Sequence, residues 1–318
     1  MKKNVVLYKK LSPALLEKLQ AHAEVTYIDD PKRDGLQRLR EALPSAQGLL
    51  GASIRMDAQL LDGATRLEAI ASVSVGVDNY DLAYLKKRGI QLTNTPDVLT
   101  QTTADTGFAL VLATARRVVE LANLVRNGQW KANIGSQHFG TDVHGKTLGI
   151  IGMGRIGEAL AQRGHCGFDM PVIYHSHSPK PAVDERFGAR HCSLDELLQT
   201  ADFVCLTLPL TPQTEHLIST RELALMKPSA IFINISRGKV VDEPALIDAL
   251  TRRQIRGAGL DVFTQEPVNP DSPLLKLDNV VATPHIGSAT EETREAMAAC
   301  AVDNLIAALS GERPANLV

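Results

Sequence analysis

Cysteines, aromatic residues and long apolar runs are all scarce in this chain of 318 residues. The four cysteines lack C-x-x-C spacing, which argues against a disulfide framework or a zinc site and favours reduced core thiols. No apolar run approaches the roughly 20 residues that a membrane-spanning helix needs. The formal net charge is only −2, which argues against a nucleic-acid partner. The cysteines are Cys166, Cys192, Cys205 and Cys300.

The rest of the composition is that of an ordinary globular protein, with 44% hydrophobic and 22% charged residues. The length suggests about two domains. The first residues lead directly into a short strand-like run and show no cleavable signal segment. Together with the scattered thiols, this start predicts a cytoplasmic protein.

The clearest motif follows a short apolar run, Leu148 to Ile151, that predicts a buried strand. Gly152, Gly154 and Gly157 then supply G-x-G-x-x-G spacing, and a helical pattern begins. In dinucleotide-binding folds the first glycine allows a tight turn, the second lets the backbone approach a pyrophosphate, and the third lets helix and strand pack closely. The helix N-terminus offers free N–H groups to the phosphates. Glycine turns are common, but this strand and helix context predicts dinucleotide binding.

Strand-like and helical segments alternate over residues 4–98 and again over residues 147–284. This rhythm predicts an α/β protein with two doubly wound parallel-sheet domains. A long helix is expected from Pro96 to Asn127, apolar nearly all round and therefore buried on several sides. A last helix, from Ser288 to Leu309, is expected to return to the first domain.

The segment after the second strand of the glycine-motif domain lacks an acidic residue. NAD-binding folds usually place an Asp or Glu there to hold the ribose hydroxyls. This chain has His175, Ser176, His177 and Ser178, with Lys180 close behind. These side chains can donate to the extra phosphate of NADP, although arginine, the better phosphate ligand, is missing. The pattern favours NADP(H); the alternative is a relaxed site that also accepts NAD(H).

Arg237, Glu266 and His285 follow three successive predicted strands. Carboxyl ends of parallel strands meet at one edge of a sheet, where the nicotinamide also falls. An arginine can hold a carboxylate by two hydrogen bonds, and a histidine can give a proton to a carbonyl oxygen. A glutamate partner would favour the protonated ring and fix its orientation. Taken alone, Arg237 could also be an exposed loop charge, and Glu266 and His285 are more typical of solvated or structural positions than of catalytic ones. Together with the glycine motif, the three residues predict a redox site for a 2-oxo acid.

The chain resembles the D-isomer-specific 2-hydroxyacid dehydrogenase family over essentially its whole length. The motifs that carry the resemblance are Gly152–Gly157, Asn234–Gly238, Gly259–Phe263 with Glu266–Pro267, and Pro284–Gly287. Within the family it is most similar to the bacterial glyoxylate/hydroxypyruvate reductases that also reduce 2-ketogluconate. The segments that match this branch are Ser74–Asn79, Leu99–Thr100, Gly128–Trp130 and Ala298–Leu305.

The resemblance implies a Rossmann NAD(P)-binding domain at residues 99–287 and a flavodoxin-like substrate domain made of residues 1–98 and 288–318. It implies that Arg237, Glu266 and His285 are catalytic and that His285 is the proton donor. The backbone of Val75 and Gly76 is expected to bind the substrate carboxylate with Arg237 and His285. A homodimer clasped through residues 96–144 is also implied. The composition itself leads us to expect no metal, nucleic-acid or membrane partner.

The same resemblance assigns the cofactor a broad set of contacts, with Asp261 expected at the nicotinamide carboxamide. The expected cofactor-binding residues are Gly152, Gly154, Arg155, Ile156, Gly157, His175, Ser176, His177, Ser178, Leu208, Pro209, Thr214, Ile235, Ser236, Arg237, Asp261, His285, Gly287 and Ser288. NADPH-dependent members carry arginines where this chain has His177 and Ser178, which leaves the strength of the NADPH preference open.

Other classes share parts of this pattern. Transcriptional corepressors reuse the same fold and the same three residues as a nucleotide-sensing binding module without turnover, so that class stays an alternative. Formate dehydrogenases of the superfamily have glutamine at the position of Glu266, which argues against them. The sequence does not identify which 2-oxo acid is physiological; oxidation of NADPH with glyoxylate, hydroxypyruvate or 2-ketogluconate would separate enzyme from binding module.

Overall fold

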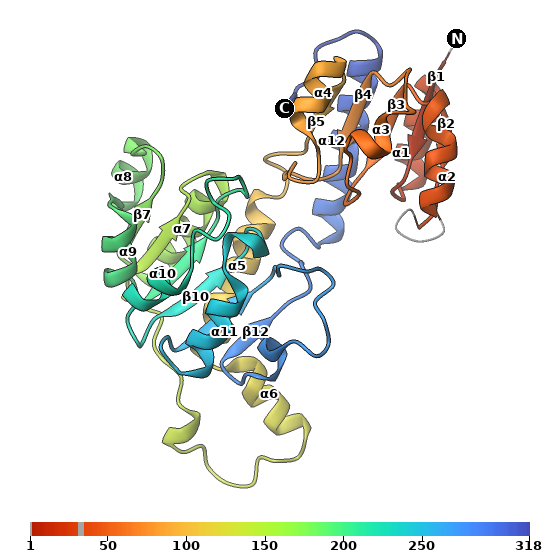
Figure 1. The fold of residues 1–318 in the computed structure, drawn as a ribbon. Coiled ribbons are helices and arrows are strands. Elements are labelled where there is room, and N and C mark those ends of the chain that lie inside the picture. Colours follow the sequence, from red (N-terminus) through yellow and green to blue (C-terminus); the bar gives the residue numbers. More distant parts are fainter. Residues whose placement is uncertain (1, 31–34) are drawn as a thin grey trace. The chain divides into compact units, whose positions relative to one another are not determined.

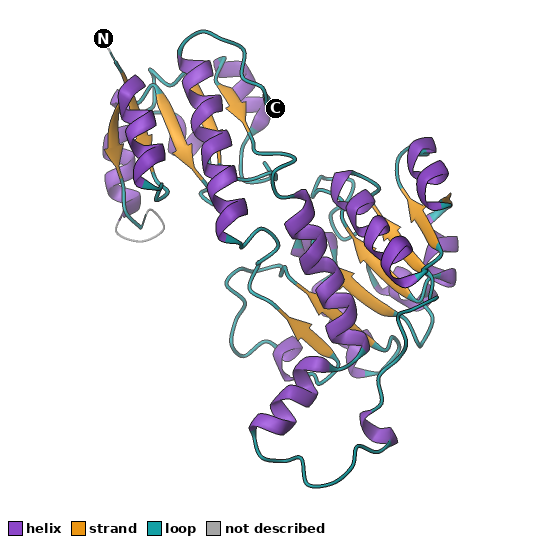
Figure 2. Cartoon of the chain, turned by 180° about the vertical axis from the view of Figure 1, so that it is seen from behind, coloured by secondary structure: helices purple, strands orange, loops and turns teal. Residues whose placement is uncertain are grey.

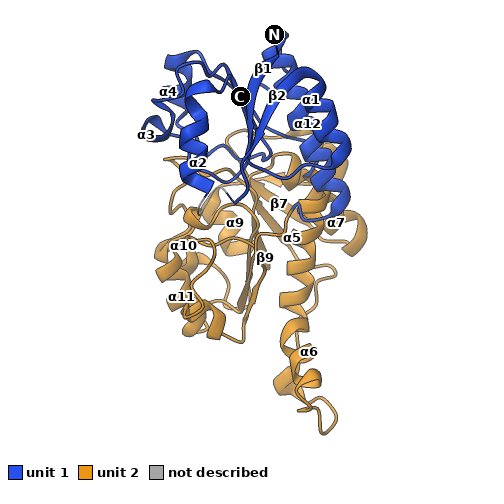
Figure 3. Cartoon of the chain, turned by 90° about the vertical axis from the view of Figure 1, so that its right-hand side faces the viewer, with its two compact units in different colours: residues 1–99, 288–318 blue, residues 100–287 orange. Residues whose placement is uncertain are grey.

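The computed structural model describes residues 2–30 and 35–318, which form two compact units of parallel sheet covered by helices. Unit 1 contains the chain up to Leu99 and again from Ser288 to Val318, and unit 2 runs from Thr100 to Gly287 (Figure 3). The chain therefore passes out of unit 1 once and returns to it once. The predicted α/β class with two doubly wound parallel-sheet domains is confirmed.

Unit 1 is built on a five-stranded sheet with the strand order β2-β1-β3-β4-β5 and parallel pairing throughout. Its strands are β1 (Lys3–Leu7), β2 (Ala23–Tyr27), β3 (Gly48–Gly51), β4 (Ala69–Ser72) and β5 (Gln91–Thr93). Its helices are α1 (Pro13–His22), α2 (Gly35–Ala42), α3 (Ala58–Leu61), α4 (Leu82–Arg88) and α12 (Glu291–Leu309), with a 3-10 turn η1 (Leu43–Ser45). This order is the flavodoxin-like one.

Helices α1 and α12 cover one face of this sheet, and α2, α3 and α4 cover the other (Figure 3). Helix α12 comes from the end of the sequence but packs on β3, β4 and β5. It can lie close to the strands because Ala298, Ala301 and Ala308 are small and buried there, next to Val302 and Leu305. The predicted return of the last helix to the first domain is thus what the structure has.

Unit 2 is built on a seven-stranded sheet with the order β12-β11-β10-β9-β6-β7-β8, again parallel throughout (Figures 1 and 2). Its strands are β6 (Leu148–Ile151), β7 (Val172–His175), β8 (Arg190–His191), β9 (Phe203–Leu206), β10 (Ile231–Asn234), β11 (Gly257–Leu260) and β12 (Val280–Ala282). The order reverses between β6 and β9, which is the switch point where Rossmann folds bind dinucleotides.

The helices of unit 2 include a layer on each face of the sheet. They are α5 (Thr100–Ala115), α6 (Val118–Arg126), α7 (Arg155–Phe168), α8 (Pro181–Phe187), α9 (Leu194–Thr200), α10 (Thr220–Leu225) and α11 (Glu243–Thr251), with 3-10 turns η2 (Ser136–His138), η3 (Gly238–Val240) and η4 (Pro273–Lys276). Helices α5 and α7 pack together over one apolar core, and α9, α10 and α11 enclose the other. Because both faces are covered, strands such as β6 and β9 are buried at every position.

The sequence predicts one continuous helix from Pro96 to Asn127, but the structure has two helices there, so this prediction is wrong. Helix α5 begins at Thr100 and ends at Ala115, and α6 starts only after Arg117, whose φ of 55° lies in the left-handed region. The Arg117 guanidinium holds this break by donating to Glu120, at 2.8 and 2.6 Å. Periodicity alone does not reveal such a break, because the apolar pattern continues across it.

Three smaller predictions also needed correction. Two short strands, β5 and β8, are not among the strands that the sequence predicts, since they contain few apolar residues. The last helix is capped by Thr290, whose side chain accepts from the Thr293 N–H, and not by Ser288. The S-x-x-E spacing of Ser193 and Glu196 predicts a reciprocal capping box at α9, but only half of it forms: the Ser193 hydroxyl accepts from the Glu196 N–H, whereas the Glu196 carboxylate pairs with Arg190. Among the described residues no helix is both long and apolar enough to cross a membrane.

Candidate active site

The turn between β6 and α7 has the geometry that the glycine motif predicts. Gly152 leaves the strand with a φ of 102°, which other residues rarely adopt. A Cβ on Gly157 would lie 2.4 Å from the Gly152 carbonyl oxygen, so turn and helix touch backbone to backbone. A Cβ on Gly154, the N-cap of α7, would meet nothing within 4 Å. The helix N-terminus therefore has an open approach, which fits a dinucleotide pyrophosphate; Arg155 and Ile156 form its first turn.

The loop after β9 closes this turn from the side. The Thr207 hydroxyl donates to the Gly152 carbonyl oxygen at 2.5 Å, and Leu208 packs against Gly152. The Thr214 hydroxyl donates to the Pro209 carbonyl oxygen at 2.7 Å and accepts from the Thr211 N–H at 2.8 Å. The side chain of Thr214 thus shapes the loop itself, and Thr207 is a supporting residue that the sequence analysis missed.

The segment that follows β7 carries the candidate phosphate ligands. Its side chains His177, Ser178 and Lys180 are exposed, whereas His175 and Ser176 are half-buried. The half-buried His175 ring faces the backbone carbonyl of Cys192 through Nδ1, at 3.1 Å. No acidic residue occurs between His175 and Pro181.

Arg237 lies at the carboxyl end of β10, in a turn that Asn234 organises. The buried Asn234 side chain accepts from the Ser236 N–H and hydroxyl, at 2.9 and 2.8 Å, and donates to the Arg237 carbonyl oxygen at 3.0 Å. Ile235 and Ser236 are themselves buried. An asparagine that bonds two residues ahead is a recognised turn former, so the sequence carried a signal for this role.

Gly238 brings the Arg237 turn against the loop that carries Glu266. A Cβ on Gly238 would lie 1.9 Å from the carbonyl carbon of Phe263, so only glycine allows this backbone contact. The Arg237 guanidinium donates to the Ser236 carbonyl oxygen at 2.9 Å, and its charge acts on the Glu266 carboxylate. Two loops that are distant in sequence therefore share one edge of the sheet.

Glu266 and His285 form a direct pair. His285 Nδ1 lies 2.7 Å from Glu266 Oε2, and the Phe263 N–H donates to Glu266 Oε1 at 3.0 Å. Partial burial raises the pKa of Glu266, but the hydrogen bonds from His285 and Phe263, with the charges of His285 and Arg237, outweigh it and lower that pKa below its ordinary value. The carboxylate is therefore ionised and orients the imidazole.

The buried Asp261 holds the His285 loop in place. Its Oδ1 accepts from the Thr283 hydroxyl and the Ile286 N–H, at 2.7 and 2.8 Å, and its Oδ2 accepts from the Gly287 N–H at 2.8 Å. Asp261 is only 1% exposed. His285 has a φ of 55°, a left-handed conformation that occurs preferentially at functional sites in non-glycine residues. The predicted nicotinamide contact of Asp261 stays a prediction; its evident role is to shape the loop.

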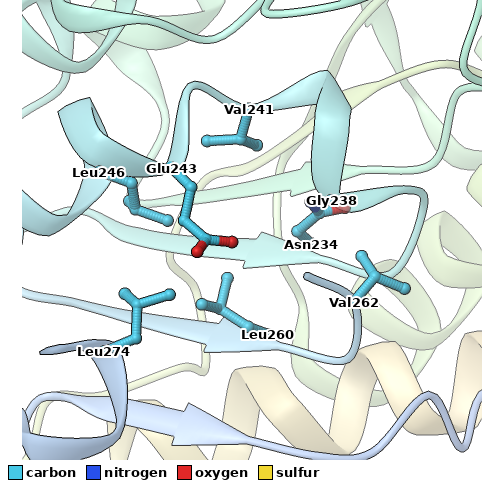
Figure 4. A pocket seen from close by; sticks show the side chains of 8 residues that line it. All are labelled: Asn234, Gly238, Val241, Glu243, Leu246, Leu260, Val262 and Leu274. Atoms are coloured by element: carbon cyan, nitrogen blue, oxygen red, sulfur yellow. The ribbon is translucent and has the colours of Figure 1, made fainter. Parts of the chain in front are cut away.

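A small cleft lies behind these loops, between η3, α11 and the ends of β10 and β11 (Figure 4). Its volume of about 10 Å³ leaves room for roughly one water, so it is a packing feature. The Glu243 side chain points into it from the first turn of α11, and Oε2 accepts from the Thr264 N–H at 3.0 Å. Glu243 thus supports the loop of Glu266, a role that nothing in the sequence indicated.

The Val75–Gly76 turn lies at the carboxyl edge of the five-stranded sheet, in unit 1. The Thr95 N–H donates to the Ser74 carbonyl oxygen and the Asn94 side chain donates to that of Val75, both at 2.9 Å. Val75 and Gly76 are half-buried. Asn94 therefore holds the turn from the end of the neighbouring strand, a third supporting role, after those of Thr207 and Glu243, that the sequence did not indicate. Ser288, the last predicted cofactor contact, is the first residue of the returning part of unit 1.

Among the described residues, no group of three or more His, Cys, Asp or Glu side chains could hold a metal ion. All four cysteines are free thiols.

Comparisons with known proteins agree along the whole chain. The family model for the NAD-binding domain of the D-isomer specific 2-hydroxyacid dehydrogenases matches residues 108–287. The glyoxylate/hydroxypyruvate reductase B of Escherichia fergusonii is 56% identical over 318 residues, which cover 100% of this chain and 98% of the relative. A protein from Thermus thermophilus has a solved structure with a TM-score of 0.91 and 45% identity, covering 99% of both chains. The NADPH-dependent glyoxylate/hydroxypyruvate reductase of Sinorhizobium meliloti, solved with NADP and malonate, has a TM-score of 0.88 and 32% identity, covering 100% of this chain and 97% of that one.

Proposed function

The chain belongs to the D-isomer specific 2-hydroxyacid dehydrogenase family, as its motifs predicted, and we propose that it reduces glyoxylate to glycolate and hydroxypyruvate to D-glycerate with NAD(P)H. The observation that carries this proposal is the His285–Glu266 pair, 2.7 Å apart, at the same sheet edge as Arg237. The 56% identity to a relative named for these two substrates supports the choice of acids. 2-Ketogluconate is a further proposed substrate.

The proposed chemistry needs one proton donor and one carboxylate ligand from the chain. A reduced nicotinamide cofactor held by unit 2 would supply the hydride that C2 of the 2-oxo acid receives. His285 Nδ1 donates to Glu266, which leaves Nε2 of the protonated ring to give its proton to the carbonyl oxygen. Arg237 binds the substrate carboxylate, and the Val75–Gly76 backbone is the proposed second contact. Glu266 compensates the charge of the imidazolium before transfer.

We propose NADPH as the preferred cofactor, bound by unit 2. The absence of an acid after β7 removes the group that would repel a 2′-phosphate, and His177, Ser178 and Lys180 are exposed and able to donate to it. The NADPH-dependent relative from Sinorhizobium meliloti supports the same choice. A relaxed preference remains the alternative, because no arginine occurs in this segment. The four cysteines are free thiols, which suits the cytoplasm, and so does a reaction that consumes NADPH. We therefore propose the cytoplasm as the location.

We also propose a homodimer clasped through residues 96–144. Within unit 2, a groove of about 940 Å³ lies between α6 and the amino ends of β10, β11 and β12. Apolar side chains around α6 and the following loop are exposed, for example Val125 at 54%, Trp130 at 60% and Phe139 at 59%. Such a concentration is typical of an interaction surface.

The oligomeric state tests this proposal. Sedimentation equilibrium of the wild type should give twice the chain mass, and Val125→Asp should shift the measured mass toward that of one chain. A wild type that sediments as a monomer would refute the dimer.

The test of the function is a steady-state panel. Glyoxylate, hydroxypyruvate and 2-ketogluconate are each assayed with NADPH and with NADH, following absorbance of the reduced cofactor, and the glycerate formed from hydroxypyruvate is resolved on a chiral column. Turnover to the D acid with NADPH preferred is the expected result. Tight NADPH binding without turnover of any 2-oxo acid would support the nucleotide-sensing module instead.

A further inference from the structure

Two histidines tie the ends of β7 and β8 together in a reciprocal way. His175 Nδ1 lies 3.1 Å from the carbonyl oxygen of Cys192, and His191 Nε2 lies 3.1 Å from that of Ser176. A carbonyl oxygen can only accept, so both ring nitrogens carry a hydrogen and donate. His175 thus bonds the residue after His191, and His191 bonds the residue after His175. Their rings are parallel within 10°, with centroids 6.4 Å apart.

Tyr174 anchors the other end of the same loop. The Lys180 N–H donates to the Tyr174 hydroxyl at 2.6 Å, and the Tyr174 side chain is fully buried. Its ring also packs beside His191, at 5.2 Å between centroids. Burial raises the pKa of Tyr174, so its hydroxyl stays neutral at ordinary pH.

The segment between these anchors, Ser176–Lys180, is the candidate phosphate loop. The Ser176 hydroxyl donates to the Ser178 carbonyl oxygen at 2.7 Å, which tightens the loop from within. The side chains of His177, Ser178 and Lys180 remain exposed. The donors therefore face solvent, while His191 and Tyr174 fix the backbone that carries them.

We infer that His191 and Tyr174 are positioning residues for the 2′-phosphate of NADP(H), an inference that rests on the NADPH preference proposed above. An arginine is a preorganised fork that binds phosphate with little help. Separate hydroxyl, imidazole and ammonium donors must each be held in place, because ordering them on binding weakens affinity. A loop fixed at both ends before the nucleotide arrives supplies that order. Neither residue needs to touch the cofactor.

The experiment measures nucleotide affinity of the full chain by titration calorimetry. The variants are His191→Leu, His191→Gln and Tyr174→Phe, and the probes are NADPH, NADH and adenosine 2′,5′-bisphosphate. Glutamine keeps an N–H donor near the position of Nε2, so it is the rescue variant. His22→Leu is the matched control, since His22 also bonds a backbone carbonyl, that of Lys18, but in unit 1.

His191→Leu and Tyr174→Phe should weaken NADPH and adenosine 2′,5′-bisphosphate binding by about tenfold, the change expected from loss of an ordinary anchoring interaction. NADH affinity should change by less than about twofold, and kcat with saturating NADPH should stay the same. His191→Gln should recover most of the loss, and His22→Leu should behave as the wild type. An equal loss for NADH and NADPH would overturn the inference, because it would indicate general damage to unit 2.

The two proposals fail in different ways. If the wild type binds NADPH and NADH equally well, the NADPH preference is refuted, and the positioning role falls with it. If the wild type prefers NADPH and the three variants keep the same ratio of affinities, only the positioning role is refuted.

Discussion

The two halves of the seven-stranded sheet end in loops of different chemistry. At β6 and β7 the loops are held by backbone contacts and by hydrogen bonds to backbone atoms, such as those of Gly157, Tyr174 and His191. At β10, β11 and β12 the loops carry a guanidinium, a carboxylate and an imidazole that interact with one another. The first half is suited to binding and the second to proton transfer. Substitutions in the two halves should therefore change different kinetic constants.

The largest difference between an effect on turnover and an effect on cofactor binding is expected at His285. His285→Ala removes the proposed proton donor, so kcat should fall by about 10²–10⁴-fold while the Kd for NADPH stays within a few-fold. Stopped-flow turnover and nucleotide titration measure the two quantities. His144→Ala is the matched control, because His144 is an exposed histidine paired with an exposed Asp169 in the same unit. Near-normal turnover in His285→Ala would remove His285 from the chemistry.

A smaller effect in the same half is expected at Arg237. Arg237→Gln removes the proposed charged pair with the substrate carboxylate, so KM for glyoxylate should rise by about 10–100-fold. NADPH affinity should change little. Arg237→Lys should recover only part of the loss, since an ammonium cannot donate in the planar fork. If the KM for NADPH rises as much as the KM for glyoxylate, the result would contradict the assignment of cofactor binding and substrate chemistry to different halves of the sheet.

In the binding half the sharpest test is Gly157. Gly157→Ala places a methyl group 2.4 Å from the Gly152 carbonyl oxygen, so it should destabilise the fold by about 1–3 kcal/mol and weaken NADH and NADPH alike. Gly167→Ala, in the same helix, meets nothing within 4 Å and should stabilise the protein by about 0.5–1 kcal/mol. Thermal unfolding measures both. Equal effects of the two substitutions would contradict the close contact of helix and turn.

The smallest effect concerns pH. The pKa of Glu266 in the folded protein lies below its ordinary value of 4.5, so its pairing stabilises the protein above that value. This contribution is lost as pH falls through the lowered folded pKa. Since the side chain is 36% exposed, solvent screening keeps the effect modest. The Tm difference between the wild type and Glu266→Gln should therefore shrink toward acid pH. A Tm difference that grows toward acid pH would contradict a lowered pKa for Glu266.

The residues that sequence reasoning identified share one property: their signal is local. The G-x-G-x-x-G turn, the strand-end arginine and histidine, and the missing acid after β7 are each legible within about ten residues of chain. Apolar runs and loop motifs sufficed to predict two parallel-sheet domains, because a buried parallel strand needs a continuous apolar segment. The break between α5 and α6 and the polar strand β8 escaped, because neither interrupts nor extends the apolar pattern.

By itself, the sequence determined the fold class, the family and the residue types available for the chemistry. Only the tertiary structure decided which groups support them: Asn94 for the Val75 turn, Glu243 for the Glu266 loop, and His191 for the candidate phosphate loop. The physical reason is that a hydrogen bond depends on distances of about 3 Å between atoms that are often many residues apart in the chain. Such pairings arise from the packing of whole elements, and no local pattern records them.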